Sequence, residues 1–443
     1  MQNSFLIGSP GDGANPFLGR VSAAGAVTEN GSVSAGDKAI LRELAKKYAE
    51  LAADEVNIER VRRIKDMNGL KEVRPPVWVD EVPWHEMDFD GSLTLKCECE
   101  AARVLEQYFR RVQYRWKYFQ ADMVVENTIS VIKVYESTGM GIEIDEQTTS
   151  PDPNNPIVSH HYEDQLDTEA KVASLKIPAV TARPEIDKKH LEFVSDILDG
   201  ILPVRLRGHG VYYCPWDMIS QYRGAQVCIE DTLENPELLH ATIKKFTEIG
   251  ISYYDQMQEQ ELFDWDIQAL HCTPPYSGEL PAKDFNGKTR YKDMWFRGMA
   301  QPFVMVSPAM RDEFDLEYMK PVIAKFGLAY YGCCEPLHKI MPSLKQIPNM
   351  RKIGASPWAD IPSLAEQIGS GYVMARKPNP ASVAMVLNEE ALRKEIGETA
   401  EVCRANKTPC EFVLKDISTV GKKPENLFNW VKITAGVIDK YYN

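Results

Sequence analysis

The first hundred residues show apolar positions at helical spacing. One predicted helix begins near Gly36, and its apolar face is formed by Ile40, Leu41, Leu44, Tyr48 and Leu51. A second long helix is predicted over 99–119, with an apolar face formed by Leu105, Phe109, Val112 and Trp116. Pro75-Pro76 interrupts the helical pattern and starts an extended segment. Residues 36–120 are therefore predicted to form a helical N-terminal extension that includes a loop.

From residue 121 onward, short apolar runs alternate with helical stretches. The runs that predict strands are 123–127, 202–206, 267–272, 302–306, 328–332, 350–354, 372–376 and 411–414. Helical patterns at 236–257, 308–326, 361–369 and 389–404 lie between them. Repeated βα units indicate an α/β protein with a parallel sheet. Because no G-x-G-x-x-G or Walker loop is present, we expect 121–443 to form a (β/α)8 TIM barrel rather than a nucleotide-binding open sheet.

Composition narrows the class of protein. The net charge of −13 argues against nucleic-acid binding, and no apolar run is long enough to span a membrane. Residues 1–35 are rich in small and polar residues, which predicts a flexible tail, and they carry no secretory signal. Nine cysteines, an odd number in a long chain, favour reduced thiols and a cytoplasmic location.

Candidate chemistry gathers where predicted strands end. In a barrel the active site lies at the carboxyl ends of the strands, which draws attention to His271 and Cys272 and to the segment GCCEPLH. That segment places two thiols, a carboxylate and an imidazole within a few residues, and these are ligand types that zinc accepts. The predicted metal ligands are Glu317, Cys333, Cys334 and His338. The alternative is that the cysteines pack as small buried side chains and His338 caps a helix.

Other strand ends supply candidate catalytic and substrate-binding groups. His338, His271, Glu335 and His85 are candidate acid–base residues. Aromatic and imidazole side chains that could contact a substrate are Trp84, His209, Tyr213, Tyr331 and Trp358. Trp84 and His85 belong to the acidic and aromatic stretch 78–91, which is either a substrate cover or a loop that closes the barrel mouth without chemistry.

Several stretches together resemble the uroporphyrinogen decarboxylase superfamily. They are RPPVW at 74–78, SPAMRDEFDLEYMKPVIAKFG at 307–327, YGCCEPLHKIMPSLKQIPNMRKIGASPWAD at 331–360 and YVMARKPNP at 372–380. The resemblance covers roughly 37–443 and implies a (β/α)8 barrel with N-terminal helices. Asp80, Glu81 and Glu86 stand where the decarboxylase has arginines for its polycarboxylate substrate, so the resemblance does not extend to that activity.

The chain is most similar to the cobalamin-dependent O-demethylase methyltransferases of this superfamily. The resemblance implies cleavage of a methyl ether, most simply of a methoxylated aromatic, and transfer of the methyl group to the cob(I)alamin of a separate corrinoid protein. In that branch zinc is held by two glutamates and a histidine; Glu317 and His338 have the spacing of the last two, and Pro302 stands in place of the first. The thiol-activating branch has His-x-Cys at the sixth strand, where this sequence has Tyr331-Gly332-Cys333.

Two functions remain open from the sequence. The first is the corrinoid-linked O-demethylase with a small methoxylated substrate, a possible zinc ion and cobalamin supplied in trans. The second is a decarboxylase or another lyase of the same superfamily that acts on a small carboxylic or aromatic substrate. A homodimer is possible in either case, and neither nucleic acid nor membrane is an expected partner.

Overall fold

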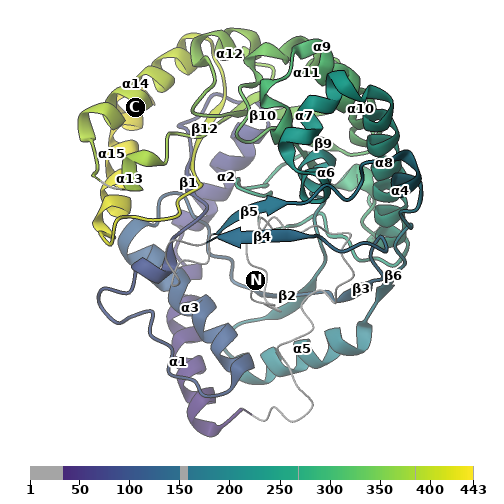
Figure 1. Cartoon of the computed structure of the whole chain (residues 1–443). Helices are drawn as coiled ribbons and strands as arrows, with labels where there is room; N and C mark the ends of the chain where they lie inside the picture. The colour runs from purple at the N-terminus through teal and green to yellow at the C-terminus, as the bar shows by residue number, and fades with distance from the viewer. Residues whose placement is uncertain (1–32, 150–157, 268, 385, 443) are drawn as a thin grey trace.

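The computed structural model describes residues 33–149, 158–267, 269–384 and 386–442 (Figure 1). The predicted tail 1–35 therefore lies almost entirely outside the described residues. Three long helices precede most of the sheet: α1 (Ala35–Ala52), α2 (Val56–Asn68) and α3 (Glu100–Phe119). Ser34 caps α1 by accepting a hydrogen bond from the Asp37 N–H. Helices α1 and α3 pack together around Leu41, Tyr48, Leu105 and Phe109, which confirms the two predicted apolar faces.

A parallel sheet of six strands forms the centre of the molecule. Its order is β1-β12-β11-β10-β9-β8. These strands are β1 (Val77–Val79), β8 (Trp295–Gly298), β9 (Leu328–Tyr331), β10 (Met350–Ala355), β11 (Val373–Arg376) and β12 (Cys410–Leu414). A separate parallel pair joins β2 (Ile129–Ile132) to β7 (Val204–Arg207). Two antiparallel pairs join β3 (Tyr135–Ser137) to β6 (Val180–Ala182) and β4 (Glu146–Thr149) to β5 (Ser159–Tyr162).

The closed eight-stranded barrel expected from the sequence is not what the described residues form, because strand pairing ends at β1 and β8. Of the run 302–306, predicted as a strand, all but the last residue belongs to the 3₁₀ helix Gln301–Met305, where Pro302 offers no N–H for a sheet. The predicted strand 123–127 is also absent, and the Val125 N–H donates to the Asn57 side chain instead of to a neighbouring strand.

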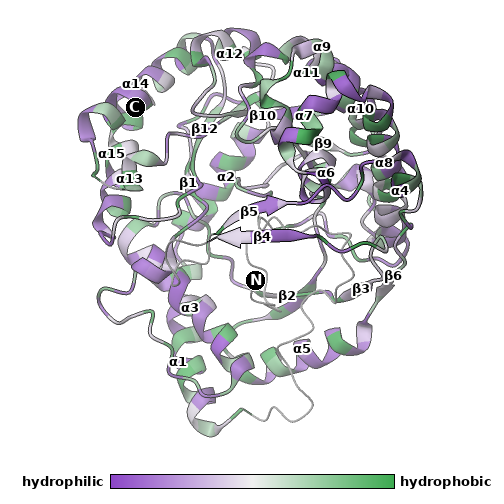
Figure 2. Cartoon of the chain, in the orientation of Figure 1, coloured by the Kyte–Doolittle hydropathy of each residue, from purple (hydrophilic) through white to green (hydrophobic). Residues whose placement is uncertain are grey.

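The remaining helices lie around the sheet, and their apolar faces form the main core. They are α4 (Glu169–Ala173), α5 (Pro184–Leu198), α6 (Pro215–Arg223), α7 (Ala225–Glu234), α8 (Pro236–Glu259), α9 (Pro308–Arg311), α10 (Glu317–Ile323), α11 (Met341–Leu344), α12 (Ile361–Ile368), α13 (Ala381–Ala384), α14 (Glu389–Ala405) and α15 (Glu425–Tyr442). Figure 2 shows hydrophobic and hydrophilic residues mixed along these outer helices, whereas the hairpin β4–β5 is almost wholly hydrophilic. None of the helices in the described parts of the chain is long and apolar enough to cross a membrane.

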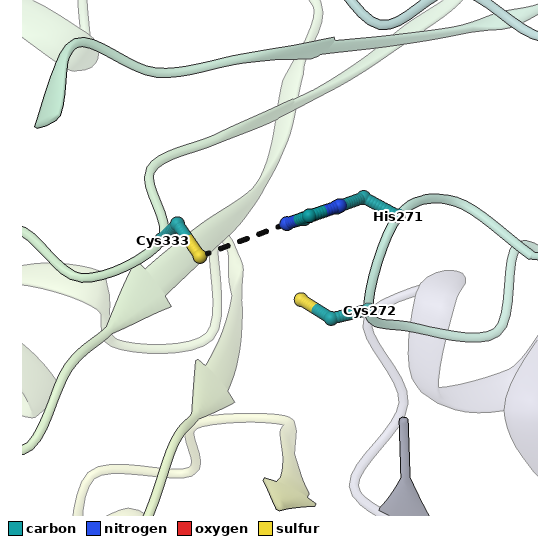
Figure 3. A group of neighbouring side chains, drawn as sticks. All are labelled: His271, Cys272 and Cys333. Atoms are coloured by element: carbon teal, nitrogen blue, oxygen red, sulfur yellow. Dashed lines mark hydrogen bonds between the residues drawn. The ribbon is translucent and has the colours of Figure 1, made fainter. Parts of the chain in front are cut away.

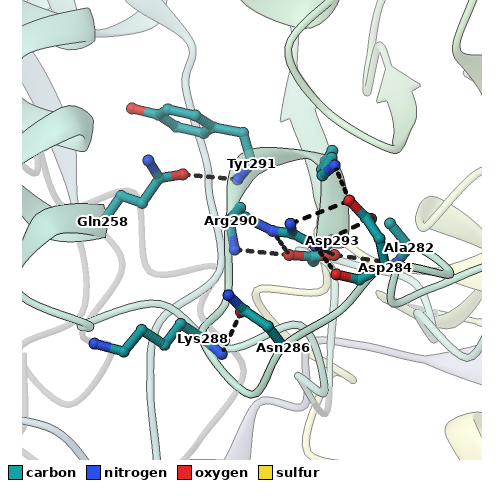
Figure 4. Close-up of polar contacts among 9 residues, drawn as sticks. Gln258, Ala282, Asp284, Asn286, Lys288, Arg290, Tyr291 and Asp293 are labelled. Atoms are coloured by element: carbon teal, nitrogen blue, oxygen red, sulfur yellow. Dashed lines mark hydrogen bonds and ion pairs between the residues drawn. The ribbon is translucent and has the colours of Figure 1, made fainter.

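A buried carboxylate fixes the loop that leads into β8. Asp293 is fully buried and accepts hydrogen bonds from the Arg290 N–H at 2.9 Å, from Arg290 Nε at 2.8 Å and from the Ala282 N–H at 3.1 Å (Figure 4). Arg290 also pairs with Asp284 at 3.2 Å. Because β8 begins two residues after Asp293, this network sets the position of β8, which lies at one edge of the six-stranded sheet.

The inner face of the sheet, defined here as the face that bears Trp78, Trp295, Leu328, Tyr330, Ala375 and Val413, carries an ion pair out of contact with water. Lys352 Nζ lies 2.8 Å from Glu411 Oε1, and both side chains have zero exposure. Burial raises the pKa of Glu411, while Lys352 opposes that shift.

We predict that Lys352→Met lowers the free energy of unfolding by about 3–5 kcal/mol, because it leaves the Glu411 carboxylate buried and uncompensated. The double variant Lys352→Met/Glu411→Leu should recover most of that loss. Urea denaturation of the two variants and the wild type measures both effects. An equal loss in the single and double variants would show that the pair is not the source of the stability change.

Candidate metal centre

Three metal-ligating side chains come together at the carboxyl end of the sheet. The ligand atoms of His271, Cys272 and Cys333 all lie within 4.8 Å of one another. His271 is 7% exposed, and both thiols are fully buried. Figure 3 shows His271 and Cys272 extending from one loop toward Cys333, which follows β9. We call these three residues the His–Cys–Cys cluster.

A tight turn explains how two adjacent residues reach one point. In an extended strand His271 and Cys272 would point to opposite faces. Instead the Leu270 N–H donates to the Thr273 carbonyl at 2.9 Å and the Thr273 N–H to the Leu270 carbonyl at 3.2 Å, which closes a turn over 270–273. His271 has a positive φ of 52°, a conformation uncommon for residues other than glycine and found preferentially at functional sites.

Two glycines place Cys333 opposite that turn. Gly332 has a φ of 90°, and a Cβ on it would lie 2.1 Å from Leu337 Cδ1. A Cβ on Gly354 of β10 would lie 2.6 Å from the Gly332 carbonyl oxygen. The chain can therefore leave β9 in this direction only because both positions lack side chains.

The charge state of the cluster follows from its surroundings. Hydrogen bonds with Cys272 and Cys334 hold the pKa of the Cys333 thiol well below its usual range. Lys415 Nζ also donates to Cys333 Sγ at 3.1 Å. Burial raises the pKa of Cys272 well above its usual range and lowers the pKa of His271 to about 4. Near neutral pH the metal-free cluster thus contains one thiolate, one thiol and one neutral imidazole.

These donors fit zinc. Thiolate and neutral imidazole are its usual ligands, and three protein ligands leave a fourth position for substrate, the arrangement typical of catalytic rather than structural zinc. In the alternative stated above, Cys333 and Cys334 pack as small buried side chains and His338 caps a helix. His338 does accept a hydrogen bond from the Asp360 N–H at the start of α12, but Cys333 Sγ also has His271 Nε2 at 3.8 Å.

A carboxylate network supports Cys333 from behind. Glu335, which is 1% exposed, accepts the Cys333 N–H at 2.6 Å and the Ala300 N–H at 3.0 Å. Arg311 lies 2.8 Å from Glu335, and although burial opposes it, this cation helps to keep the pKa of Glu335 below its usual range. Glu335 is therefore ionised and suited to positioning Cys333.

A second carboxyl group near this network has a raised pKa. Burial, and after it the negative charge of Glu335, raise the pKa of Asp217 to about 7.

Of the other predicted metal ligands, the structure places Glu317 and His338 away from the cluster and Cys334 beside it. Glu317 is on α10, is 64% exposed and pairs with Lys320 at 2.8 Å. His338 accepts a hydrogen bond on Nδ1 from the Asp360 N–H at 3.2 Å, at the start of α12. Cys334 is adjacent: its Sγ is 3.7 Å from Cys333 Sγ and 3.4 Å from Asp416 Oδ2. Of the four predicted ligands, only Cys333 belongs to the cluster.

The predicted substrate and acid–base residues are spread more widely. Tyr213 is buried and donates to the Phe246 carbonyl, and Tyr331 is buried against Arg311 and Asp315. His209 bonds the Lys133 carbonyl at 2.7 Å, and burial lowers its pKa to about 4. The remaining three residues lie elsewhere. The Trp84 ring lies 4.9 Å from the guanidinium of Arg111, and His85 lies 3.7 Å from Glu86. Trp358 is on the surface, with 72% exposure.

Sequence reasoning missed the charges that surround the cluster. Four cations project from the inner face of the sheet or from the residue that follows a strand: Arg297, Lys352, Lys377 and Lys415, each at most 5% exposed. The carboxylates at such positions are Glu411, which is fully buried, and Asp80, which follows β1. The signal was available, because each cation interrupts or ends an apolar strand run that should otherwise be uncharged.

Comparison with known proteins adds little. No protein-family model matches the chain, and no curated protein matches it. Among solved structures, a methyltransferase from Methanosarcina mazei superposes with a TM-score of 0.38 and 12% sequence identity, over 69% of this chain and 77% of that chain. A likeness at this level supports neither a fold nor an activity for this chain.

The vicinal cysteines provide a matched test of the cluster. We predict that the wild type binds one zinc ion per chain and that Cys333→Ser lowers zinc affinity by at least about 10²-fold, because a thiolate ligand is lost. Cys334→Ser, the neighbouring and equally conservative change, should keep the stoichiometry. Competition with a chromophoric chelator measures both. Equal weakening by the two substitutions would remove Cys333 from the ligand set.

The predicted charge states also fix the pH dependence of zinc binding. Cys333 is already a thiolate, whereas Cys272 must lose a proton, so zinc should displace one proton per chain near pH 7. Affinity should then rise about tenfold per pH unit between pH 6 and 8, because higher pH favours the Cys272 thiolate. Calorimetry in buffers of different ionisation enthalpy counts the protons. Release of two protons would mean that Cys333 is protonated in the metal-free protein.

Proposed function

We propose that the protein is a zinc-dependent methyltransferase. It removes the methyl group of a methyl ether, most simply a methoxylated aromatic, and passes it to the cob(I)alamin of a separate corrinoid protein. The observation that carries the metal-dependent part is the His–Cys–Cys cluster, whose three converging donors leave a position for substrate. Its place at the carboxyl end of a parallel sheet is where α/β enzymes bind their substrates.

The choice of methyl transfer is supported by the sequence. The four stretches between 74 and 380 that resemble the cobalamin-dependent branch include the segment that places Cys333 beside Glu335. No D-x-H-x-x-G corrinoid motif occurs in the chain, so cobalamin would be supplied by the partner. A (β/α)8 barrel is part of the same proposal: the six-stranded sheet would form most of the wall, and the parallel bridge between His209 and Phe263 extends the β2–β7 side.

The residues of the site would divide the work as follows. His271, Cys272 and Cys333 would hold zinc, and Glu335 and Arg311 would fix Cys333 in place. Bound zinc supplies a Lewis acid that stabilises negative charge on an ether oxygen as its methyl group leaves. Phenoxide is a poor leaving group, since the pKa of phenol is about 10. Asp217, whose pKa of about 7 leaves it partly protonated at neutral pH, would supply a proton to the departing oxygen.

Methyl transfer from methoxybenzoate to a reduced corrinoid protein tests the proposal. Cys272→Ser should lower the rate by at least about 10²-fold, because the zinc ligand set is broken. Cys228→Ser, which removes a buried thiol from α7, is the control and should keep the rate. Asp217→Asn should slow transfer without releasing zinc. Full activity in Cys272→Ser, or in protein stripped of metal, would exclude a role for the cluster in the reaction.

A further inference from the structure

We propose that Arg297 and Lys377 form a subsite for a carboxylate carried by the substrate. The inference deepens the proposed function, on whose metal-dependent part it rests, by naming a chemical group that the substrate bears. Both side chains are buried cations on the inner face of the sheet, and neither has a carboxylate within 4.0 Å among the described residues.

Arg297 is the clearer of the two. Its side chain has zero exposure, and its guanidinium lies 4.1 Å from the centroid of the Tyr330 ring. Nη1 donates to the carbonyl of the adjacent Gly298 at 2.7 Å, whereas Nε and Nη2 have no hydrogen-bond partner in the described part of the chain. A guanidinium held in a water-free interior with two unused donors is costly unless an anion completes it.

The two unused donors are the ones that bind carboxylates side-on. Nε and Nη2 form one edge of the guanidinium plane, and two parallel N–H donors on such an edge match the two oxygens of a carboxylate. The same chain shows this geometry at another place, where Arg223 donates from Nε and Nη2 to the two oxygens of Asp164, at 3.1 Å each. Arg297 thus presents the edge that Arg223 uses, without the carboxylate.

Lys377 contacts the hydroxyl of the same tyrosine. It is 2% exposed, and Nζ donates to the Tyr330 hydroxyl at 2.7 Å. The two remaining cations of this face have carboxylate partners, Lys352 with Glu411 at 2.8 Å and Lys415 with Asp416 at 3.0 Å. Arg297 and Lys377 are therefore the pair for which the described side chains provide no carboxylate counter-ion.

Zinc binding changes how far the cluster balances the positive charges of Arg297 and Lys377. Cys272 Sγ is 3.7 Å from the Tyr330 hydroxyl, so the cluster lies beside the tyrosine that Arg297 and Lys377 both contact. A divalent zinc ion would add two positive charges to the cluster, so that its sulfur ligands no longer offset the charges of Arg297 and Lys377, which are left for an anionic ligand. Zinc and a carboxylate are thus expected to bind cooperatively.

The test compares benzoate with benzamide, which has nearly the same shape but no charge. Calorimetry with zinc-loaded wild type should show benzoate binding at least about tenfold tighter than benzamide, because a bidentate ion pair is lost with the amide. Arg297→Met should weaken benzoate by at least about tenfold and leave benzamide unchanged. Arg376→Met is the matched control, since it removes a buried arginine that is already paired with Glu395, and it should keep benzoate affinity.

Arg297→Lys provides a second variant if Arg297→Met does not fold. It keeps the charge and removes the planar edge, so it should still lose most of the preference for benzoate over benzamide. Equal binding of the two probes by zinc-loaded wild type, or unchanged benzoate affinity in both Arg297 variants, would overturn the subsite. Benzoate binding without methyl transfer would refute the methyltransferase activity alone, whereas a chain that binds no zinc would refute both.

Discussion

The Lys352–Glu411 ion pair lies between β10 and β12 with no exposure to water, and it shows the constraint under which the whole inner face is built. Charges removed from water must be matched by nearby charges or hydrogen bonds. Lys352 meets that requirement through a carboxylate, Lys377 through the Tyr330 hydroxyl and Lys415 through the Cys333 sulfur. Arg297 meets it only in part, through the Gly298 carbonyl and the Tyr330 ring. The metal cluster and the cations therefore form one electrostatic system, in which a change at the thiols alters the free charge at Arg297.

Backbone geometry makes that system possible. The turn at 270–273 directs two consecutive side chains to one side, and the glycines at 332 and 354 let the chain after β9 approach them. Parallel pairing of β8, β9 and β10 then sets Arg297, Tyr330 and Lys352 at the same level of the sheet. Three segments distant in sequence thus supply ligands, cations and an aromatic ring to one place, and each is held by main-chain contacts rather than by the metal.

The sequence predicted the parts of the fold that depend on periodicity. Strands β7 and β9 to β12 and helices α1, α3, α8, α12 and α14 appear where apolar spacing placed them. It missed β8, whose four residues include Arg297, because a charge in a short run hides the apolar pattern. Strand-end reasoning found Cys333, but it could not show that His271 and Cys272 are ligands together, since their convergence depends on a positive φ at His271 that no residue pattern signals.

The central claim is that zinc is held by one imidazole and two thiolates with a position left for a small ligand. X-ray absorption at the zinc edge of the loaded protein measures this ligand set directly. The expected spectrum has two sulfur neighbours at about 2.3 Å and nitrogen or oxygen neighbours at about 2.0–2.1 Å, with the sulfur count falling to one in Cys333→Ser. A shell of nitrogen and oxygen only, or one whose sulfur count is the same in Cys333→Ser, would contradict the account.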